Sequence, residues 1–163
     1  MTPKIFAAAA LVLCSFMAGN AAAGTLKKRC EDLSELISAL MQTESLINDF
    51  LMPLKSIYLQ LEGESRVGNM FEFMAEASSC DTRRLWTQGL EFTALYAEDK
   101  REVIKLAEVL GSGGRQHQTK HIDLCIEKLK KNLSAAEEKR KTDGELYRKL
   151  GIYAGALAAI ILF

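Results

Sequence analysis

Residues 5–23 read IFAAAALVLCSFMAGNAAA, an apolar run interrupted only by Ser15, Gly19 and Asn20. A second run, LGIYAGALAAIILF, occupies residues 150–163 and carries no charged side chain. As an α-helix the first run would extend about 28 Å, close to the thickness of the hydrocarbon core of a bilayer. The sequence therefore predicts a membrane-spanning segment at each end of the chain, with a separate domain between them.

Basic residues flank both apolar runs on their inner sides. Lys27, Lys28 and Arg29 follow the first run, whereas Arg148 and Lys149 precede the second. Loops on the cytosolic side of a membrane carry an excess of Lys and Arg. These flanks therefore predict that everything between the two runs lies on the cytosolic side of the membrane.

The first run also has the features of a cleaved signal peptide. Lys4 forms a short basic region, and the alanines at residues 21–23 offer a cleavage site. Three observations favour an uncleaved anchor over residues 1–25. The basic cluster opposes export, cleavage would leave three unpaired cysteines in an oxidising compartment, and the second run would lack a purpose. The alternative that stays open is an exported helical adaptor whose leader is removed.

The second run is short, because fourteen residues rise only about 21 Å as a helix. A buried core helix or a re-entrant segment is the alternative, although the run has no polar face. Small residues at helical spacing predict a stripe for close packing against a partner span: Gly151, Ala154, Gly155 and Ala158. Contacts with anionic lipid headgroups are predicted for the basic residues near both runs: Lys27, Lys28, Arg29, Lys139, Arg140, Lys141, Arg148 and Lys149.

The residues between the runs have a helical composition, with abundant Ala, Leu, Glu and Lys and only two prolines in the whole chain. Pro53 is predicted to open a helix, and Ser65, Asp81 and Asp99 are predicted N-caps. Short loops make successive helices antiparallel neighbours, so residues 26–149 predict an all-α antiparallel bundle of about six helices. Apolar residues recur at steps of three and four in six segments: about 31–50, 54–61, 66–77, 82–92, 99–110 and 116–149.

Composition excludes several classes of function. The chain has 21 basic and 21 acidic residues and no long block of one sign, which argues against binding to nucleic acid. The four cysteines form no Cys-x-x-Cys pair, which favours reduced, small apolar residues over a disulfide framework.

Candidate chemistry is sparse. His117 and His121 are four residues apart, as zinc ligands on one helix face often are, but no second cluster completes a site. The Gly111–Arg115 loop lacks the Lys-Ser/Thr pair of a phosphate-binding loop. We therefore predict no catalytic residue, metal, cofactor or small-molecule substrate. An enzyme that uses the His117/His121 face is the alternative from another class.

The order of several weak motifs resembles one known family. The chain is similar to the stage III sporulation protein AB family of endospore-forming bacteria from about Leu26 to its last residue. The matching features come in this order along the chain: Leu33, Leu36, Leu40, Glu44, Ile47, Pro53-Leu54, Phe71, Trp86, Leu110-Gly111, Gln118, Lys120, Ile122, Lys149-Leu150-Gly151, Ala154-Gly155 and Ile160-Ile161-Leu162.

The resemblance implies a non-catalytic role. It implies a cytosolic bundle similar to the cytoplasmic domain of the F-type platform protein of type II secretion. It also implies a place in a secretion-like channel at the outer forespore membrane, with the bundle facing the mother-cell cytosol. The implied partners are the other proteins of that channel complex, including a hexameric secretion-type ATPase and membrane components. It carries over no catalytic residue.

Overall fold

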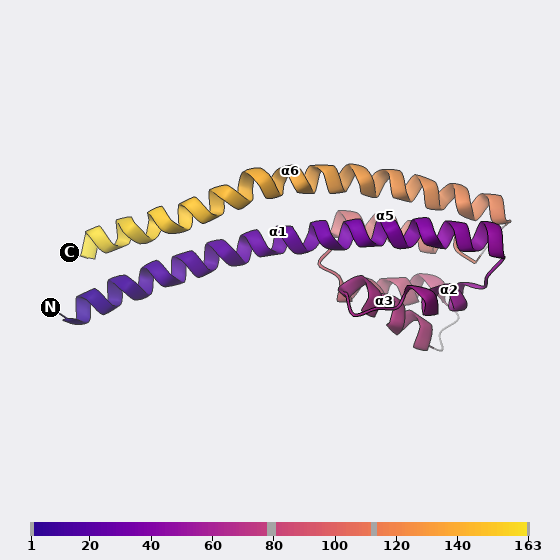
Figure 1. Ribbon diagram of the computed structural model, residues 1–163, viewed down its shortest axis with the longest axis horizontal. Helices are drawn as coiled ribbons and strands as arrows, with labels where there is room; N and C mark the ends of the chain where they lie inside the picture. The colour runs from indigo at the N-terminus through magenta and orange to yellow at the C-terminus, as the bar shows by residue number, and fades with distance from the viewer. Residues whose placement is uncertain (1, 78–80, 112–113, 163) are drawn as a thin grey trace. The chain divides into compact units, whose positions relative to one another are not determined.

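The computed structural model describes residues 2–77, 81–111 and 114–162. Within these ranges the chain is all α-helical, with no strand, as predicted. The described residues form six α-helices, and one 3-10 helix, η1, follows α4. Figure 1 labels α1, α2, α3, α5 and α6. The helices are α1 (Thr2–Phe50), α2 (Leu54–Leu61), α3 (Arg66–Glu76), α4 (Thr82–Gly89), η1 (Leu90–Phe92), α5 (Ala97–Ala107) and α6 (Arg115–Leu162).

The chain divides into two compact units, and both long helices contribute to each of them. One unit consists of residues 29–134, and the other consists of residues 1–28 together with 135–163. The unit of residues 29–134, called the bundle unit below, lies within the predicted bundle of residues 26–149, and the bounds of that predicted bundle stay a prediction. The segment predicted as a separate first bundle helix is also continuous with the apolar N-terminal run in α1.

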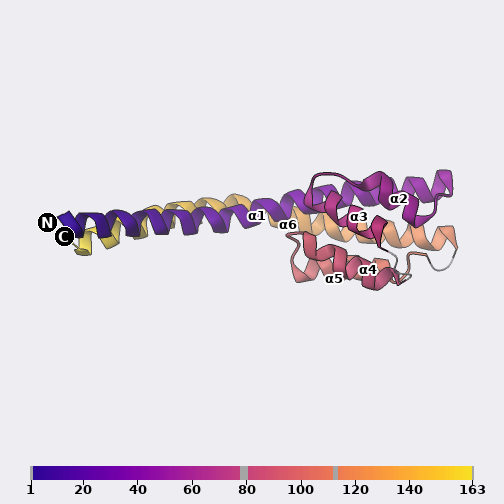
Figure 2. The same cartoon turned by 90° about the horizontal axis from the view of Figure 1, so that it is seen from below.

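Within the bundle unit, α1 supplies one continuous apolar face. Leu33, Leu36 and Leu40 are fully buried, at the three- and four-residue steps that place side chains on one side of a helix. The corresponding part of α6 runs in the opposite direction (Figure 1) and contributes Ile122 and Leu129, also fully buried. In Figure 2 the short helices form two pairs, α2 with α3 and α4 with α5, and each pair packs together.

Two of the predicted helix starts are confirmed. The Ser65 hydroxyl accepts a hydrogen bond from the backbone N–H of Gly68 (2.8 Å), and Asp81 accepts one from the N–H of Arg84 (3.2 Å). Pro53 lies one position before its predicted place, as the residue preceding α2. The side chains of Ser65 and Asp81 thus satisfy backbone N–H donors that have no partner within the first turn of a helix.

The predicted N-cap at Asp99 is wrong. The helix α5 begins two residues earlier, and Asp99 accepts a hydrogen bond from the backbone N–H of Tyr96 (3.1 Å) as the third residue of the helix. An aspartate can serve the first turn from either place, because its carboxylate reaches back as well as forward. Glu31 and Asp32, predicted to begin a helix, instead lie in the middle of α1.

An aromatic cluster fills the space between α2, α3 and α4. Trp86 is fully buried and contacts Phe71 edge to face, with their ring centroids 5.9 Å apart. Its indole N–H donates a hydrogen bond to the buried Tyr58 hydroxyl (2.9 Å). Buried tyrosine and tryptophan need such partners, so these two residues satisfy each other. Trp86 therefore belongs to the core of the bundle unit.

A close approach of backbone to backbone fixes the start of α3. A Cβ atom added at Gly68 would lie 2.5 Å from the carbonyl oxygen of Gly63, whereas one added at Gly63 would meet nothing within 4 Å. We expect Gly68→Ala to lower the free energy of unfolding by about 1–3 kcal/mol through overpacking. The matched control, Gly63→Ala, should change it by less than about 0.5 kcal/mol. Urea unfolding of the full-length protein, followed by Trp86 fluorescence, measures both, and equal effects would contradict the close contact.

The predicted membrane spans stay predictions. Most side chains of residues 2–22 and 150–162 lie outside the described residues, although Met17 and Tyr153 are described and exposed. Among the residues that the structure describes, no helix combines the length and apolar character that crossing a bilayer requires.

Candidate functional site

A buried ion pair joins α1 to α5. The Asp99 carboxylate accepts hydrogen bonds from Arg29 Nε (2.8 Å) and Nη2 (3.1 Å), and from Asn132 Nδ2 of α6 (2.8 Å). The Arg29 side chain is 3% exposed and that of Asp99 is 0% exposed. Three helices of the bundle unit therefore meet at one carboxylate.

Two further groups surround the Arg29 guanidinium. Glu98 accepts a hydrogen bond from Nη2 (2.7 Å), although its own side chain is 65% exposed, and the Tyr96 ring lies 4.1 Å from the guanidinium carbon. Burial lowers the pKa of Arg29, but the hydrogen bonds and charges of Asp99 and Glu98 outweigh it, so the pKa lies above its ordinary value. The charge of Arg29 is therefore retained inside the protein.

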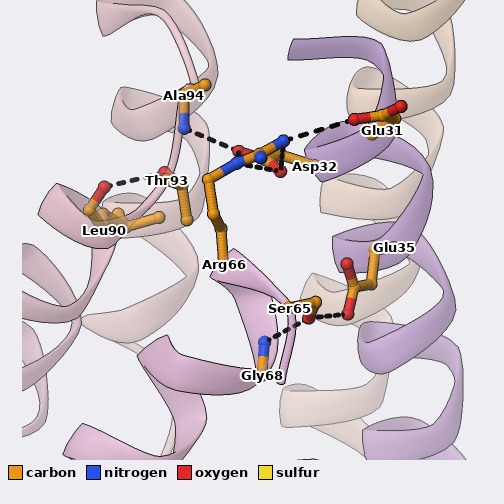
Figure 3. Close-up of polar contacts among 9 residues, drawn as sticks. All are labelled: Glu31, Asp32, Glu35, Ser65, Arg66, Gly68, Leu90, Thr93 and Ala94. Carbon is orange, nitrogen blue, oxygen red and sulfur yellow. Dashed lines mark hydrogen bonds and ion pairs between the residues drawn. The ribbon is translucent and has the colours of Figure 1, made fainter. Parts of the chain in front are cut away.

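A second carboxylate cluster lies further along α1 (Figure 3). Asp32, with a 2% exposed side chain, accepts hydrogen bonds from Arg66 Nε (2.9 Å) and from the backbone N–H of Ala94 (2.6 Å). Arg66 begins α3, and Ala94 belongs to the connection between η1 and α5. One turn further on, Ser65 donates a hydrogen bond to Glu35, which Figure 3 also shows. These contacts hold the short helices against α1.

A hollow of about 280 Å³ lies between α5 and α6. At its rim, Glu102 forms ion pairs with Lys105 (2.7 Å) and Lys128 (2.6 Å), whose hydrogen bonds lower the pKa of Glu102. Burial, together with the charge of Glu102, raises the pKa of the Cys125 thiol in its wall to about 12. Because thiol reactivity depends on the thiolate, Cys125 behaves as an apolar wall residue.

The histidine pair lies near this hollow. His117 and His121 contact each other edge to face with centroids 4.6 Å apart, and His121 lines the hollow. Within the described part of the chain, no group of three His, Cys, Asp or Glu side chains could hold a metal ion. The alternative of an enzyme that uses the His117/His121 face stays an untested hypothesis.

An exposed apolar segment occurs where α1 ends. The 50–54 segment reads Phe-Leu-Met-Pro-Leu, and Phe50 and Leu51 are 68% and 66% exposed. Leu51 has φ = 52°, a left-handed conformation that leucine rarely adopts. A hollow of about 270 Å³ lies beside it, lined mainly by apolar residues of α1 and of the 50–54 segment, and by Arg115 and Gln118 of α6.

The residues predicted to contact lipid headgroups lie in different surroundings. Arg29 is buried in the ion pair with Asp99, a structural role that the sequence analysis did not foresee. The described others are exposed: Lys27, Lys28, Lys139, Arg140, Lys141 and Lys149. The side chains of the rest lie outside the described residues: Arg148, Gly151, Ala154, Gly155 and Ala158. The headgroup contacts and the packing stripe stay predictions.

Comparisons with known proteins assign the chain to a family. The model of the family described as "Stage III sporulation protein AB (spore_III_AB)" matches residues 4–163. The chain belongs to this family. It is similar to the "Stage III sporulation protein AB" of Bacillus subtilis (strain 168), with 25% identity over 168 residues that cover 98% of each chain. No solved structure matches.

Membership of this family gives the chain a role related to sporulation, and the match includes both apolar ends. The suspected resemblance is thereby confirmed.

The sequence patterns considered above did not predict the two buried charged clusters around Asp99 and Asp32, although a sequence signal for them exists. Arg29 and Asp32 fall on the apolar stripe of Leu33 and Leu36, and Asp99 falls four residues before the buried Val103. A charge on an apolar stripe needs a buried partner.

Proposed function

We propose that the protein is a non-catalytic, membrane-anchored scaffold of a secretion-like channel that endospore formation requires. Family membership over residues 4–163 carries this proposal, because the match includes the two apolar runs as well as the bundle. The basic flanks support an orientation in which the bundle faces the cytosol.

The interior of the bundle unit supports a structural role. Its buried carboxylates are engaged by Arg29, Arg66, Asn132 and backbone N–H groups, rather than directed toward a cavity. Among the described residues, every buried side-chain nitrogen or oxygen has a hydrogen-bond partner. An active site commonly keeps polar groups available to a substrate, whereas a scaffold uses them to fix helices in register.

The proposal places the protein in the outer forespore membrane, with the bundle in the mother-cell cytosol. Its proposed partners are the membrane components of the channel and a hexameric secretion-type ATPase. The exposed 50–54 segment and the exposed charges of α6 are surfaces on which such partners could assemble.

The mature N-terminus tests the anchor. Mass spectrometry of protein from sporulating cells should find the residues before position 24 still attached, and the protein should sediment with membranes. A mature chain that starts at residue 24 and stays soluble after cell lysis would instead support the exported adaptor. Loss of the gene should also lower the yield of heat-resistant spores, and an unchanged yield would contradict the proposed requirement.

The basic flank of α1 gives a prediction about topology. Replacing Lys27 and Lys28 together with glutamine should place a fraction of the molecules with the bundle on the outer side, because a positive flank favours the cytosolic side. Protease added to spheroplasts of vegetative cells that produce the full-length protein in their plasma membrane measures that fraction. Arg29 is left unchanged in this experiment, because its substitution would also break the buried ion pair.

Arg83→Gln with Arg84→Gln is the matched control for this prediction. It removes the same charge from an exposed part of α4, which is distant from both apolar runs in the sequence. The control should leave the bundle fully protected. Complete protection in the Lys27/Lys28 variant would contradict the charge argument.

A further inference from the structure

The 50–54 segment is the most exposed apolar sequence in the described bundle unit. Five consecutive apolar residues run from the last residue of α1 to the first residue of α2, and two of them keep about two thirds of their surface in water. Single exposed apolar side chains are ordinary, but a run of this kind usually marks a site of contact.

The backbone at Leu51 is unfavourable as well. The left-handed conformation at a helix end is normally occupied by glycine or asparagine, because a branched side chain crowds the backbone there. Leu51 therefore has both a strained backbone, with φ = 52°, and an exposed apolar side chain. Such strain persists where a function selects the side chain.

The adjoining hollow combines an apolar wall with a cation. Ile47, Met52, Pro53 and Leu54 form most of the wall, and its volume of about 270 Å³ accommodates a large apolar side chain. Arg115 lines its edge and donates one hydrogen bond to the backbone oxygen of Asn48 (3.2 Å). No carboxylate in the described residues forms an ion pair with Arg115.

The electrostatic surroundings favour a negative partner. Arg115 is the first residue of α6, so the positive end of the helix dipole adds to its charge. Lys55 and Lys120 are also exposed near the starts of α2 and α6. The acidic group in the 50–54 surroundings, Asp49, already accepts a hydrogen bond from Ser45 (2.9 Å).

We propose that the 50–54 segment, its hollow and Arg115 form a docking surface for a protein segment that presents a large apolar side chain one helical turn from a carboxylate. The apolar side chain enters the hollow between Ile47 and Leu54, and the carboxylate pairs with Arg115. Phe50 and Leu51 cover the apolar face of the docked segment. This pairing of an apolar anchor with a peripheral charge pair is typical of interfaces between proteins.

The inference deepens the proposed scaffold function and rests on it for the class of partner, a soluble component of the channel. Residues 29–50 of α1 rise about 33 Å as a helix. The docking surface therefore lies at the end of the bundle unit remote from residue 29, where the chain enters it.

Photo-crosslinking in the full-length protein tests the surface. Phe50→p-benzoylphenylalanine is produced in sporulating cells, irradiated, and analysed by mass spectrometry of the linked peptides. Phe92→p-benzoylphenylalanine, at an aromatic residue 47% exposed in η1, is the matched control. We expect position 50 to link to a segment of another soluble protein that has Asp or Glu within four residues of the linked site, and position 92 not to link to that segment.

Other products would overturn the proposal. Links to lipid, to a second copy of this chain, or to a segment without an acidic residue would each exclude the proposed occupant. Absence of any link, with the protein present in the membrane fraction, would exclude the docking surface while leaving the scaffold function intact. A protein that is absent from membranes but links to an acidic segment would contradict the anchor and support the docking surface.

Charge reversal tests the role of Arg115. Arg115→Glu should lower the yield of the link from position 50 about tenfold, which corresponds to roughly 1.4 kcal/mol. Replacing the acidic residue of the linked segment with lysine should restore the yield. Arg84→Glu, an exposed charge reversal on α4, should leave the yield unchanged. Failure of the compensating change to restore the link would exclude the charge pair.

Leu51→Asn separates docking from folding. Asparagine accepts the left-handed backbone, so the stability of the bundle should be equal or higher, while the yield of the link from position 50 should fall. Trp86 fluorescence during urea unfolding reports the stability in the same preparation. An unchanged link yield would show that Leu51 takes no part in docking.

Discussion

Asp99→Asn should destabilise the full-length protein by about 3–5 kcal/mol, because it removes the buried counter-ion of Arg29 and leaves only Glu98, whose side chain is 65% exposed. The substitution conserves the shape of the side chain, so the packing around residue 99 is little changed. The Arg29 side chain is only 3% exposed, and its guanidinium packs against the Tyr96 ring. Water therefore cannot replace the lost carboxylate. Pulse proteolysis of the detergent-solubilised protein in a series of urea concentrations measures the loss.

Glu98→Gln is the control for this prediction. Glu98 contacts the same guanidinium at 2.7 Å, but its side chain is 65% exposed and water replaces much of the lost interaction. We expect a loss below about 1 kcal/mol, the ordinary value of an exposed ion pair. Equal losses for the two variants would show that burial does not decide the strength of this cluster.

Trp86→Ala should cost about 3–5 kcal/mol, comparable to the loss expected for Asp99→Asn. The indole is fully buried between α2, α3 and α4, and its removal leaves a cavity that the surrounding helices only partly close. It also leaves the hydroxyl of Tyr58 without its donor. Because Trp86 is the single tryptophan of the chain, circular dichroism during urea unfolding replaces fluorescence as the measurement.

Phe92→Ala is the matched aromatic control. Phe92 is 47% exposed and pairs with Phe73 at a centroid distance of 5.4 Å, so its truncation should cost about 1 kcal/mol. Tyr58→Phe separates the hydrogen bond from the cavity. It should cost about 1–3 kcal/mol, because it leaves the buried indole N–H unpaired. A Trp86→Ala loss no larger than that of Phe92→Ala would contradict the central place of the indole.

Local signals in the sequence were sufficient to predict the buried face of α1 and two of the helix starts. The steps of three and four through Leu33, Leu36 and Leu40 identify the buried face of α1, and Ser65 and Asp81 identify two helix starts. Each of these signals acts within one or two turns of a single helix, so no distant residue needs to be known. The two boundary errors at Pro53 and Asp99 are small, because several residues of a first turn can satisfy the same backbone donors.

The sequence by itself thus determined that the chain is all-α, which faces of its helices are apolar, and which family it resembles, since these depend on local periodicity and on the order of motifs. The partners of Arg29, Asp32 and Trp86 were decided only by the tertiary structure. Arg29 and Asp99 are 70 residues apart, and Trp86 and Tyr58 are 28 apart. A charged residue on an apolar stripe indicates that the charge needs a buried partner. That partner comes from another helix, so only the packed arrangement identifies it.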